Sequence, residues 1–335
     1  MTVAVLGYGL IGRERVQALL ALQAEGCPVQ RILLFDPALA GARPPDRVEA
    51  VDTLQQIASA RPDWVIVATP HDTAAAILSA VLPWGSRVLV EKPLGRSLEE
   101  ARAIAAISRF PDQLWVGFNY RFFPGVREAI CDARSGRFGP LVNVTMILGH
   151  GGAPGMERGW KFDPVRAGGG CLIDPGVHLL DLCRLLAAEP IEVPGATRWD
   201  GFWKTGIEEE VHLLLKAGSL VFNLQISIVR WRSAFRVEIH GCDGYGVVTG
   251  RGRSYGPQRY IRGARWAWQK GGTQAEREEV VLESEGADTF RDELRALLGA
   301  GPSALPPCPA SEALEVMALL DRCRSALGLS LPSVG

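Results

Sequence analysis

Residues 2–12 read Thr2-Val-Ala-Val-Leu-Gly7-Tyr-Gly-Leu-Ile-Gly12, a short apolar run followed by the glycine pattern G-x-G-x-x-G. The run predicts a buried strand, and the residues from Ile11 to Leu22 predict an amphipathic helix directly after it. In this context the first glycine permits a tight turn, the second lets the backbone approach a pyrophosphate, and the third allows close helix packing. We therefore predict a dinucleotide-binding turn made by Gly7, Tyr8, Gly9, Leu10, Ile11 and Gly12.

Apolar runs alternate with helical stretches over the first 118 residues. The runs cover 3–6, 32–35, 64–68, 87–90 and 114–117, and the helical stretches cover 11–22, 73–82 and 98–107. Near-continuous Val, Ile and Leu in the strands is typical of a parallel sheet covered by helices on both faces. Residues 1–118 are therefore predicted to form a doubly wound α/β domain of the Rossmann type.

The pattern changes beyond residue 118. A helix over 125–133 is followed by longer strands with polar alternation at 141–148, 209–216, 220–229, 235–240 and 278–282. Such strands predict an α+β domain with a large open, mainly antiparallel sheet, placed here at 119–310. Helices are expected over 175–186, with Pro175 in the first turn, and over 289–298. A last helix over 311–328 is expected to pack back on the first domain.

The composition excludes several classes of protein. The 335 residues are 47 % apolar, and 36 basic against 37 acidic side chains give a net charge of −1, so no global field favours nucleic acid or an anionic membrane. Seven cysteines without a C-x-x-C pair favour free thiols over a disulfide or zinc framework, and no metal is expected. No apolar run approaches the length of a spanning helix, and Met1 leads into a strand without a charged leader. A cytoplasmic protein is expected.

Asp36 follows the second predicted strand. An acidic side chain there accepts hydrogen bonds from the adenosine ribose hydroxyls and repels a 2′-phosphate, so NAD(H) is favoured over NADP(H). Arg43 nearby keeps NADP(H) open as the less favoured cofactor. The alternative is that Asp36 only starts an Asp-Pro turn with Pro37.

Two further loops follow predicted strands at their carboxyl ends, where ligands of open α/β sheets bind. They hold Thr69, Pro70 and His71, and Glu91 and Lys92, all taken here as cofactor-binding candidates. His71 is interpreted as a loop histidine rather than a catalyst. Lys92 could reach a reacting oxygen, although a solvated loop lysine is the ordinary interpretation.

The segment from Gly168 to Asp181 reads Gly-Gly-Gly-Cys-Leu-Ile-Asp-Pro-Gly-Val-His-Leu-Leu-Asp. Asp174 and His178 are four residues apart, which predicts that they share one face at the start of a helix. The alternatives are a helix N-cap for Asp174 and a hydrogen-bonded core histidine for His178.

These motifs, together with Glu91-Lys92-Pro93 and Gly117-Phe-Asn-Tyr-Arg121-Phe, resemble the Gfo/Idh/MocA oxidoreductases, the family of glucose-fructose oxidoreductase and inositol dehydrogenase. The likeness runs in order over about residues 1–190. It implies a Rossmann domain, an open antiparallel sheet, a nicotinamide cofactor and a Lys/Asp/His active site. Carried over by position, the catalytic residues are Lys92, Asp174 and His178.

What the resemblance implies is chemically consistent. His178 would act as the base for a substrate hydroxyl, Lys92 would stabilise the developing alkoxide, and Asp174 would orient the imidazole or the substrate. The substrate-binding candidates are Asn119, Arg121, Trp160, Lys161, Asp174 and His178. For Arg121, packing on the sheet is an equal alternative.

The implied activity is NAD(H)-dependent oxidation of a secondary hydroxyl of a sugar, cyclitol or glycoside, or reduction of the ketone, by a homodimer or homotetramer joined through its second-domain sheets. Nucleic acid and membrane partners are not expected. Within the family, an NAD-dependent glycoside hydrolase and an imine or tetrapyrrole reductase are alternatives. A non-catalytic NAD-binding regulator is a third, although the presence of Lys92, Asp174 and His178 together argues against it.

One segment, 251–275, carries no acid. Its basic and aromatic residues are Arg251, Arg253, Tyr255, Arg259, Tyr260, Arg262, Arg265, Trp266, Trp268 and Lys270. A solvated hairpin insertion or a subunit contact is the favoured interpretation, since arginine and aromatic residues are enriched at interfaces. The alternative is a segment that closes over a bulky or anionic substrate such as a glycoside or nucleotide-sugar. Single-stranded nucleic acid is disfavoured, because no matching domain pattern accompanies it.

Overall fold

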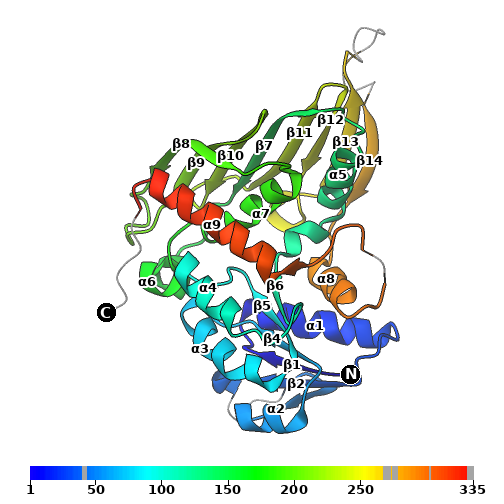
Figure 1. The fold of residues 1–335 in the computed structure, drawn as a ribbon, viewed down its shortest axis with the longest axis vertical. Coiled ribbons are helices and arrows are strands. Elements are labelled where there is room, and N and C mark those ends of the chain that lie inside the picture. Colours follow the sequence, from blue (N-terminus) through cyan, green and yellow to red (C-terminus); the bar gives the residue numbers. More distant parts are fainter. Residues whose placement is uncertain (40–43, 267–272, 274–277, 302, 330–335) are drawn as a thin grey trace. The chain divides into compact units, whose positions relative to one another are not determined.

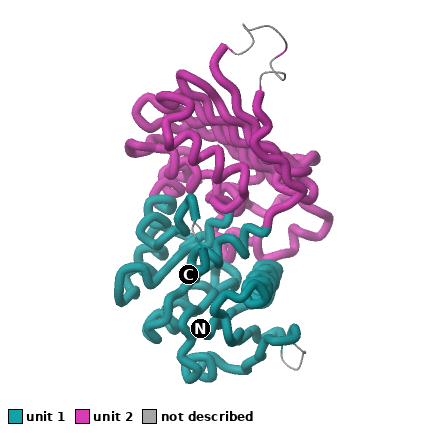
Figure 2. Tube along the Cα trace, turned by 90° about the vertical axis from the view of Figure 1, so that its right-hand side faces the viewer, with its two compact units in different colours: residues 1–119, 288–317 teal, residues 120–287, 318–335 magenta. Residues whose placement is uncertain are grey.

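The computed structural model describes residues 1–39, 44–266, 273, 278–301 and 303–329. These residues form two compact units, coloured separately in Figure 2. Unit 1 holds residues 1–119 and 288–317, and unit 2 holds residues 120–287 and the chain from 318 onward. The helix α9 (Ala310–Ala326) therefore begins in unit 1 and ends in unit 2.

Unit 1 is built on a seven-stranded sheet with the order β15-β6-β5-β4-β1-β2-β3. The strands are β1 (Thr2–Leu6), β2 (Arg31–Phe35), β3 (Val48–Ala50), β4 (Trp64–Val67), β5 (Arg87–Glu91), β6 (Leu114–Gly117) and β15 (Cys308–Pro309). The first six pair in parallel, and β15 adds to β6 in the antiparallel direction. The order from β3 to β6 reverses between β1 and β4, where sheets of this kind bind ligands.

Helices flank this sheet. They are α1 (Leu10–Ala24), α2 (Leu54–Ala60), α3 (His71–Val81), α4 (Leu98–Ala106) and α8 (Thr289–Leu297). The sequence analysis overlooked β3 and α2, which have only three and seven residues and so show too little periodicity. Thr53 and Gln56 nevertheless form a capping box at the start of α2, which is a signal that the sequence carries.

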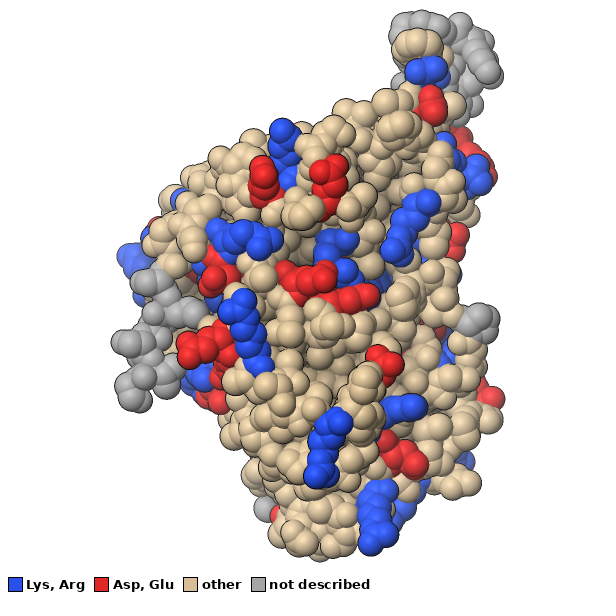
Figure 3. Space-filling model, in the orientation of Figure 1, with Lys and Arg blue, Asp and Glu red and all other residues tan. Residues whose placement is uncertain are grey.

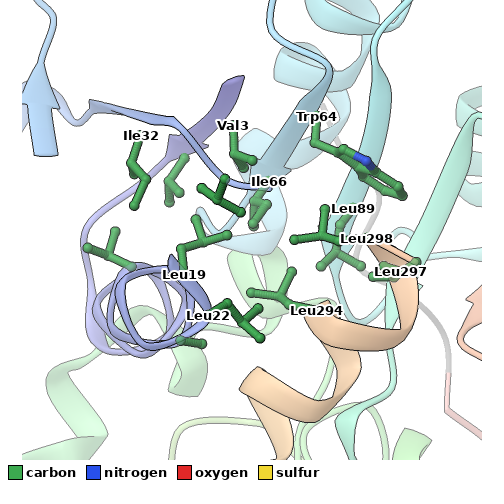
Figure 4. Packing of buried hydrophobic residues seen from close by; sticks show 14 of the residues in the cluster. Val3, Leu19, Leu22, Ile32, Trp64, Ile66, Leu89, Leu294, Leu297 and Leu298 are labelled. Carbon is green, nitrogen blue, oxygen red and sulfur yellow. The ribbon is translucent and has the colours of Figure 1, made fainter. Parts of the chain in front are cut away.

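The core of unit 1 explains why residues from the far end of the chain belong to it. Leu19 and Leu22 of α1 and Leu294, Leu297 and Leu298 at α8 are buried in one cluster with side chains of the strands, shown in Figure 4. This division differs from the expected second domain of 119–310. Residue 119 and residues 288–310 fall in unit 1, the latter because the leucines of α8 fill the same core as α1.

Unit 2 is built on an eight-stranded sheet with the order β14-β13-β12-β11-β7-β10-β9-β8. Its strands are β7 (Leu141–Gly149), β8 (Glu192–Trp199), β9 (Glu210–Ala217), β10 (Leu220–Ser227), β11 (Ala234–Gly241), β12 (Gly244–Thr249), β13 (Gln258–Ala264) and β14 (Glu279–Ser284). The sheet is mainly antiparallel, as expected, with one parallel pair, β7 and β10. The sequence analysis overlooked β8, β12 and β13.

The helices of unit 2 are α5 (Pro124–Arg134), α6 (Pro164–Ala167) and α7 (Val177–Leu186). Figure 1 shows α5 and α7 on the same side of the sheet. Burial alternates residue by residue along β9, from buried Val211 through exposed His212 to buried Ala217. A sheet with one covered face produces this alternation.

The structure neutralises much of the basic segment 251–275. Arg259 lies 3.9 Å from Glu283, Arg265 lies 3.8 Å from Asp243, and Arg262 pairs with Glu279 at 2.8 Å and with Asp132 at 3.0 Å. These acids lie outside the segment in sequence: Glu279 and Glu283 are on β14, Asp132 is on α5, and Asp243 is in the turn between β11 and β12. Figure 3 likewise shows basic and acidic side chains interspersed on one face of the molecule. Trp268, Lys270 and Arg43 lie outside the described residues.

Replacement of Leu294 by alanine tests the place of α8 in unit 1. The side chain is 1 % exposed, so Leu294→Ala is expected to lower the free energy of unfolding by about 2–5 kcal/mol through lost burial and a residual cavity. Urea unfolding followed by circular dichroism measures the change. The control is Val165→Ala on α6, where the side chain is 43 % exposed and a change below about 1 kcal/mol is expected. Equal effects of the two substitutions would contradict this packing.

Candidate active site

The glycine turn of unit 1 leaves no room for side chains at two positions and ample room at a third. Gly7 has φ +95°, and a Cβ atom there would lie 2.5 Å from the Ala68 carbonyl oxygen. A Cβ atom on Gly12 would lie 2.0 Å from the Gly7 carbonyl oxygen. A Cβ atom on Gly9 would meet nothing within 4 Å. The backbone at Gly9 is thus open to a close-fitting ligand.

The start of α1 adds an anion-binding element to this turn. Gly9 is the N-cap, and no side chain of the described residues caps the helix. The first N–H groups of a helix have no intrahelical partner and attract anions such as phosphate. The first residue of the helix, Leu10, is 71 % exposed. The N-terminus therefore faces outward beside the open position at Gly9.

The Asp36 carboxylate forms the Asp-Pro turn and also contacts the glycine turn. Its Oδ1 accepts a hydrogen bond from the Ala38 backbone N–H at 2.8 Å, as in an Asp-Pro turn, and its Oδ2 accepts one from Tyr8 N–H at 2.6 Å. The carboxylate is thus tied directly to the glycine turn. Each carboxylate oxygen can accept more than one hydrogen bond, so these contacts leave capacity for ribose hydroxyls.

Thr69 and His71 follow β4 beside the glycine turn. The Thr69 Oγ1 atom is buried, and no described residue forms a hydrogen bond with it, while the Thr69 methyl group packs against Gly7. A buried hydroxyl in this position is suited to a ligand hydrogen bond. His71 is 8 % exposed and is the first residue of α3, with Pro70 as N-cap, so its interpretation as a loop histidine is wrong.

A buried ion-pair network holds the end of β5, directly before Lys92. Arg15 of α1 is fully buried; its Nε donates to Glu91 at 2.6 Å, and its Nη2 forms an ion pair with Glu293 of α8 at 2.6 Å. Burial opposes the charge, but the two carboxylates hold the pKa of Arg15 above its ordinary value. Glu91 is thereby engaged in joining β5 to α1. The Lys92–Pro93 peptide bond that follows is cis.

In unit 2, a buried carboxylate clamps the glycine-rich segment before Asp174. Glu208 accepts hydrogen bonds from the Gly170 N–H at 2.9 Å and from the Leu172 N–H at 3.0 Å. Burial raises the pKa of Glu208, although these hydrogen bonds act against the shift. Arg324 of α9 donates to the Gly168 carbonyl oxygen. Contacts from two elements distant in sequence therefore fix this segment.

Asp174 lies in the turn before α7 and not on the helix. Its backbone N–H donates to the Gly170 carbonyl oxygen at 2.9 Å, and α7 begins only at Val177, with Gly176 as N-cap. The expected helix start at Pro175 and the shared helical face with His178 are therefore wrong. Asp174 itself precedes a proline, a position at which helical conformation is disfavoured. The Asp174 carboxylate pairs with Lys161 Nζ at 2.7 Å. The Lys161 ammonium also lies 5.8 Å from the Trp160 ring centroid.

His178 lies in the first turn of α7, is 4 % exposed, and stacks on Tyr120. The two ring centroids are 3.8 Å apart and the ring planes differ by 6°. Burial raises the pKa of Tyr120, so the phenol stays neutral. The stack fixes the plane of the imidazole. The sequence analysis did not single out Tyr120, although it lies within the quoted segment 117–122.

Two expected substrate-binding residues make structural contacts. Arg121 and Asp181 of α7 are fully buried and form two hydrogen bonds, of 2.8 and 2.5 Å. The Asn119 amide donates to Thr289 Oγ1 at 2.8 Å within unit 1. Arg121 therefore positions the helix that carries His178.

His150 was missed by the sequence analysis. Its Nδ1 accepts a hydrogen bond from the Gly152 N–H at 3.0 Å. Burial, and then the positive charge of Arg251, lower the pKa of His150 despite the nearby carboxylate of Asp174. The only sequence signal was the run His150-Gly-Gly at the end of β7.

Comparison with known families decides the identity of the fold. The profile described as "Oxidoreductase family, NAD-binding Rossmann fold" matches residues 1–118, and the profile described as "GFO/IDH/MocA C-terminal domain" matches residues 126–246. The chain belongs to the GFO/IDH/MocA family. It is accordingly an oxidoreductase with a Rossmann-type NAD-binding domain followed by a domain with a large, mainly antiparallel sheet.

Similar proteins agree with this assignment. The inositol 2-dehydrogenase of Rhizobium meliloti (strain 1021) is 29 % identical over 257 residues, which cover 71 % of this chain and 73 % of that relative. The structure of a levoglucosan dehydrogenase in complex with NADH has a TM-score of 0.79 at 20 % identity, over 100 % of both chains. A 3-ketoreductase variant from Actinomadura kijaniata in complex with TDP-benzene and NADP has a TM-score of 0.75 at 20 % identity, over 98 % of both chains.

Other features of the described residues bear on the sequence expectations. The seven cysteines are all free thiols. The part of the chain that the structure describes contains no cluster of three or more His, Cys, Asp or Glu side chains suited to a metal ion. None of its helices is long and apolar enough to cross a membrane.

Replacement of Arg121 distinguishes a structural role from substrate binding. Arg121→Met leaves the Asp181 carboxylate buried without this cation, so the free energy of unfolding is expected to fall by about 3–5 kcal/mol. Chemical denaturation measures it. In the double variant Arg121→Met/Asp181→Leu, much of the stability is expected to return, because no charge is then left buried. If the free energy of unfolding of Arg121→Met were unchanged, a role of Arg121 in substrate binding would be favoured instead.

A pH series tests the environment of His150. The pKa of His150 is lower in the folded protein than the unperturbed value of 6.5, so the unfolded chain binds the proton more readily. As the pH falls below 6.5, protonation of His150 therefore lowers the free energy of unfolding. His150→Gln keeps an acceptor for Gly152 but does not titrate. From about pH 7.5 to about pH 5.5, its free energy of unfolding is expected to fall less than that of the wild type. The free energies are measured by urea unfolding. An equal fall for the wild type and His150→Gln would show that the pKa of His150 is not lowered in the folded protein.

Proposed function

We propose that this member of the GFO/IDH/MocA family is an NAD(H)-dependent dehydrogenase that oxidises a secondary hydroxyl of a sugar, cyclitol or glycoside, or reduces the corresponding ketone. The observation that carries the cofactor preference is the hydrogen bond from Tyr8 N–H to the Asp36 carboxylate, which ties an acidic group to the glycine turn. The substrate class is supported by the inositol and levoglucosan dehydrogenases among the similar proteins.

The residues of unit 1 fit the dinucleotide. When bound, NAD(H) supplies the nicotinamide carbon that takes or gives up a hydride. The open backbone at Gly9 and the first turn of α1 bind the pyrophosphate, and Thr69 Oγ1 offers a hydrogen bond beside them. Asp36 accepts hydrogen bonds from ribose hydroxyls and repels a 2′-phosphate.

The proton chemistry is assigned to three residues. His178 accepts the hydroxyl proton at a ring nitrogen, and the stack on Tyr120 holds the imidazole in a fixed plane. Lys92, which follows β5 in unit 1, donates a hydrogen bond from Nζ to a substrate oxygen and stabilises its negative charge. Asp174, paired with Lys161, orients the substrate or the imidazole. Asn119 and Arg121 are assigned a positioning role instead of substrate contact.

We extend the proposal to a homodimer or homotetramer joined through the sheet of unit 2. Apolar side chains on its strands support this, because Val142 is 49 % exposed and Leu214 is 41 % exposed. Exposed apolar side chains on a broad sheet favour association with a second copy.

A binding experiment tests the nucleotide site. The purified protein, checked by absorbance and mass spectrometry for cofactor retained through purification, is titrated by calorimetry with NAD⁺, NADH, NADP⁺ and NADPH. We expect NAD(H) to bind about tenfold more tightly than NADP(H), and Asp36→Ala to remove this preference, since a charged hydrogen bond is lost. Asp52→Ala, an exposed aspartate of the same unit, serves as the control and is expected to change neither affinity. Tighter binding of NADP(H) by the wild type would contradict the assignment.

A kinetic experiment tests the catalytic residues. With a substrate found by screening sugars and cyclitols for NADH formation, His178→Gln and Lys92→Met are each expected to lower kcat by about 10²–10⁴-fold, because each removes a group that acts in the transition state. NAD⁺ affinity of His178→Gln is expected to stay unchanged. His240→Gln, a half-exposed histidine on β11, is the matched control. Full activity of His178→Gln would overturn the assignment of His178 as the base. It would favour the alternative that the protein is a non-catalytic NAD-binding regulator.

A further inference from the structure

Arg251 differs from the arginines that follow it in the basic segment. It lies in the loop between β12 and β13, and among the residues that the structure describes no carboxylate pairs with its guanidinium. Its Nε atom is buried, and no described residue accepts a hydrogen bond from it. Arg259, Arg262 and Arg265 instead have carboxylates within 4 Å. Arg251 therefore carries a charge that this part of the chain leaves uncompensated.

The contacts of Arg251 are to aromatic rings. Its Cζ lies 3.9 Å from the Tyr255 ring centroid and 5.2 Å from that of Tyr120. Tyr120 in turn stacks on His178. A guanidinium held by aromatic rings keeps its in-plane N–H groups available for an acceptor. One tyrosine ring thus connects this cation to the imidazole proposed as the base.

The backbone around Arg251 is fixed. Gly250 has φ +71°, a Cβ atom on it would lie 2.0 Å from the Pro257 carbonyl oxygen, and its N–H donates to the Phe235 carbonyl oxygen on β11 at 3.0 Å. The Gly252 N–H donates to the Gly256 carbonyl oxygen at 2.7 Å and closes the loop. Because the loop is already closed in this way, little conformational entropy of the backbone around Arg251 is lost when a ligand binds.

The neighbouring charges do not compensate Arg251. The Asp174 carboxylate is engaged by Lys161 at 2.7 Å. Burial and the Arg251 charge lower the pKa of His150, which is therefore neutral, and Tyr120 is a neutral phenol. The Tyr120 ring, which stacks on His178, thus lies beside the Arg251 cation and near the Asp174 carboxylate, which pairs with Lys161. An anion is the group that this arrangement would attract.

We infer that Arg251 binds an anionic substituent of the substrate, a carboxylate or a phosphate group, so that the preferred substrates are acidic sugars or sugar phosphates. The guanidinium edge matches both groups in a two-point hydrogen-bonded geometry. This inference rests on the proposed function, because it concerns the substrate of the His178 site. It identifies Arg251 as a residue that determines specificity, distinct from those that move the proton.

Substrates matched except for charge test the inference. NADH formation is measured with D-glucose, D-glucuronate and D-glucose 6-phosphate, and with D-galactose, D-galacturonate and D-galactose 6-phosphate. Binding of the same compounds in the presence of NADH is measured by calorimetry, which requires no turnover. We expect an acidic member to bind at least about tenfold more tightly than its neutral counterpart, as a charge-assisted pair provides. Comparison of the uronates with the 6-phosphates shows whether the protein prefers a carboxylate or a phosphate group.

Variants of Arg251 assign the selectivity. Arg251→Gln is expected to remove the tenfold preference, with the loss in KM rather than kcat and neutral sugars unchanged within about twofold. Arg251→Lys keeps the charge without the planar fork and is expected to retain part of the preference. Arg259→Gln is the control on β13. If Arg251→Gln does not fold, judged by its melting temperature, the comparison of wild type with Arg251→Lys decides.

The outcomes separate this inference from the proposed function. Equal binding of acidic and neutral sugars, a selectivity that Arg251→Gln retains, or no binding of any acidic compound overturns the role of Arg251, with or without turnover. Turnover of neutral sugars alone supports the dehydrogenase and overturns the inference. Selective binding that depends on Arg251, without NADH formation from any compound, supports the inference and argues against the dehydrogenase.

Discussion

A guanidinium fully buried in unit 1 holds together the three elements on which its site depends. Arg15 lies on the helix that starts at the glycine turn, and it pairs with Glu91 at the end of the strand before Lys92 and with Glu293 of α8. A Cβ atom on Gly117 of β6 would lie 2.7 Å from Arg15 Nη2, so the packing around this group leaves no spare volume. Such a network contributes little net stability compared with apolar packing, but loss of one member leaves a buried charge unpaired. Its effect is to fix the relative positions of the glycine turn and the Lys92 loop.

Unit 2 uses the same type of interaction for α7, the helix that carries His178. Arg121 and Asp181 are both fully buried, and their pair anchors α7 to the segment that also supplies Tyr120. The helix therefore holds His178 through Asp181 one turn away, and Tyr120 holds the imidazole plane from the adjacent residue of the same segment. Glu208 does the equivalent for Asp174, because its carboxylate binds two backbone N–H groups of the preceding turn. In each case a polar side chain fixes the position of the segment that carries His178 or Asp174.

The arginines of the basic segment in unit 2 differ in their partners. The basic segment looks anomalous as a linear sequence because its acidic partners are elsewhere in the chain. Once β13 pairs with β12 and β14 and packs near α5, Asp132, Glu279 and Glu283 lie opposite its arginines. The pairs with Glu279 and Glu283 run between neighbouring strands and are partly exposed, so they contribute modestly to stability. Arg251 stands apart, because aromatic rings rather than carboxylates surround it.

The local features can be predicted from short stretches of adjacent residues, because those residues carry the signal. The glycine turn, the apolar strands of the parallel sheet, the change to an antiparallel pattern and the family motifs around Lys92, Asp174 and His178 are all of this type. Short elements such as β3 and α2 lack periodicity and could not be predicted in this way, and β13 lies in the segment that was interpreted as a hairpin insertion or a subunit contact. The fold alone shows that α8 completes the core of unit 1, that Arg121 pairs with Asp181, and that Asp174 precedes α7 instead of starting it. The physical reason is that burial and charge pairing are properties of residues far apart in the chain, and a linear pattern carries no record of which of them meet.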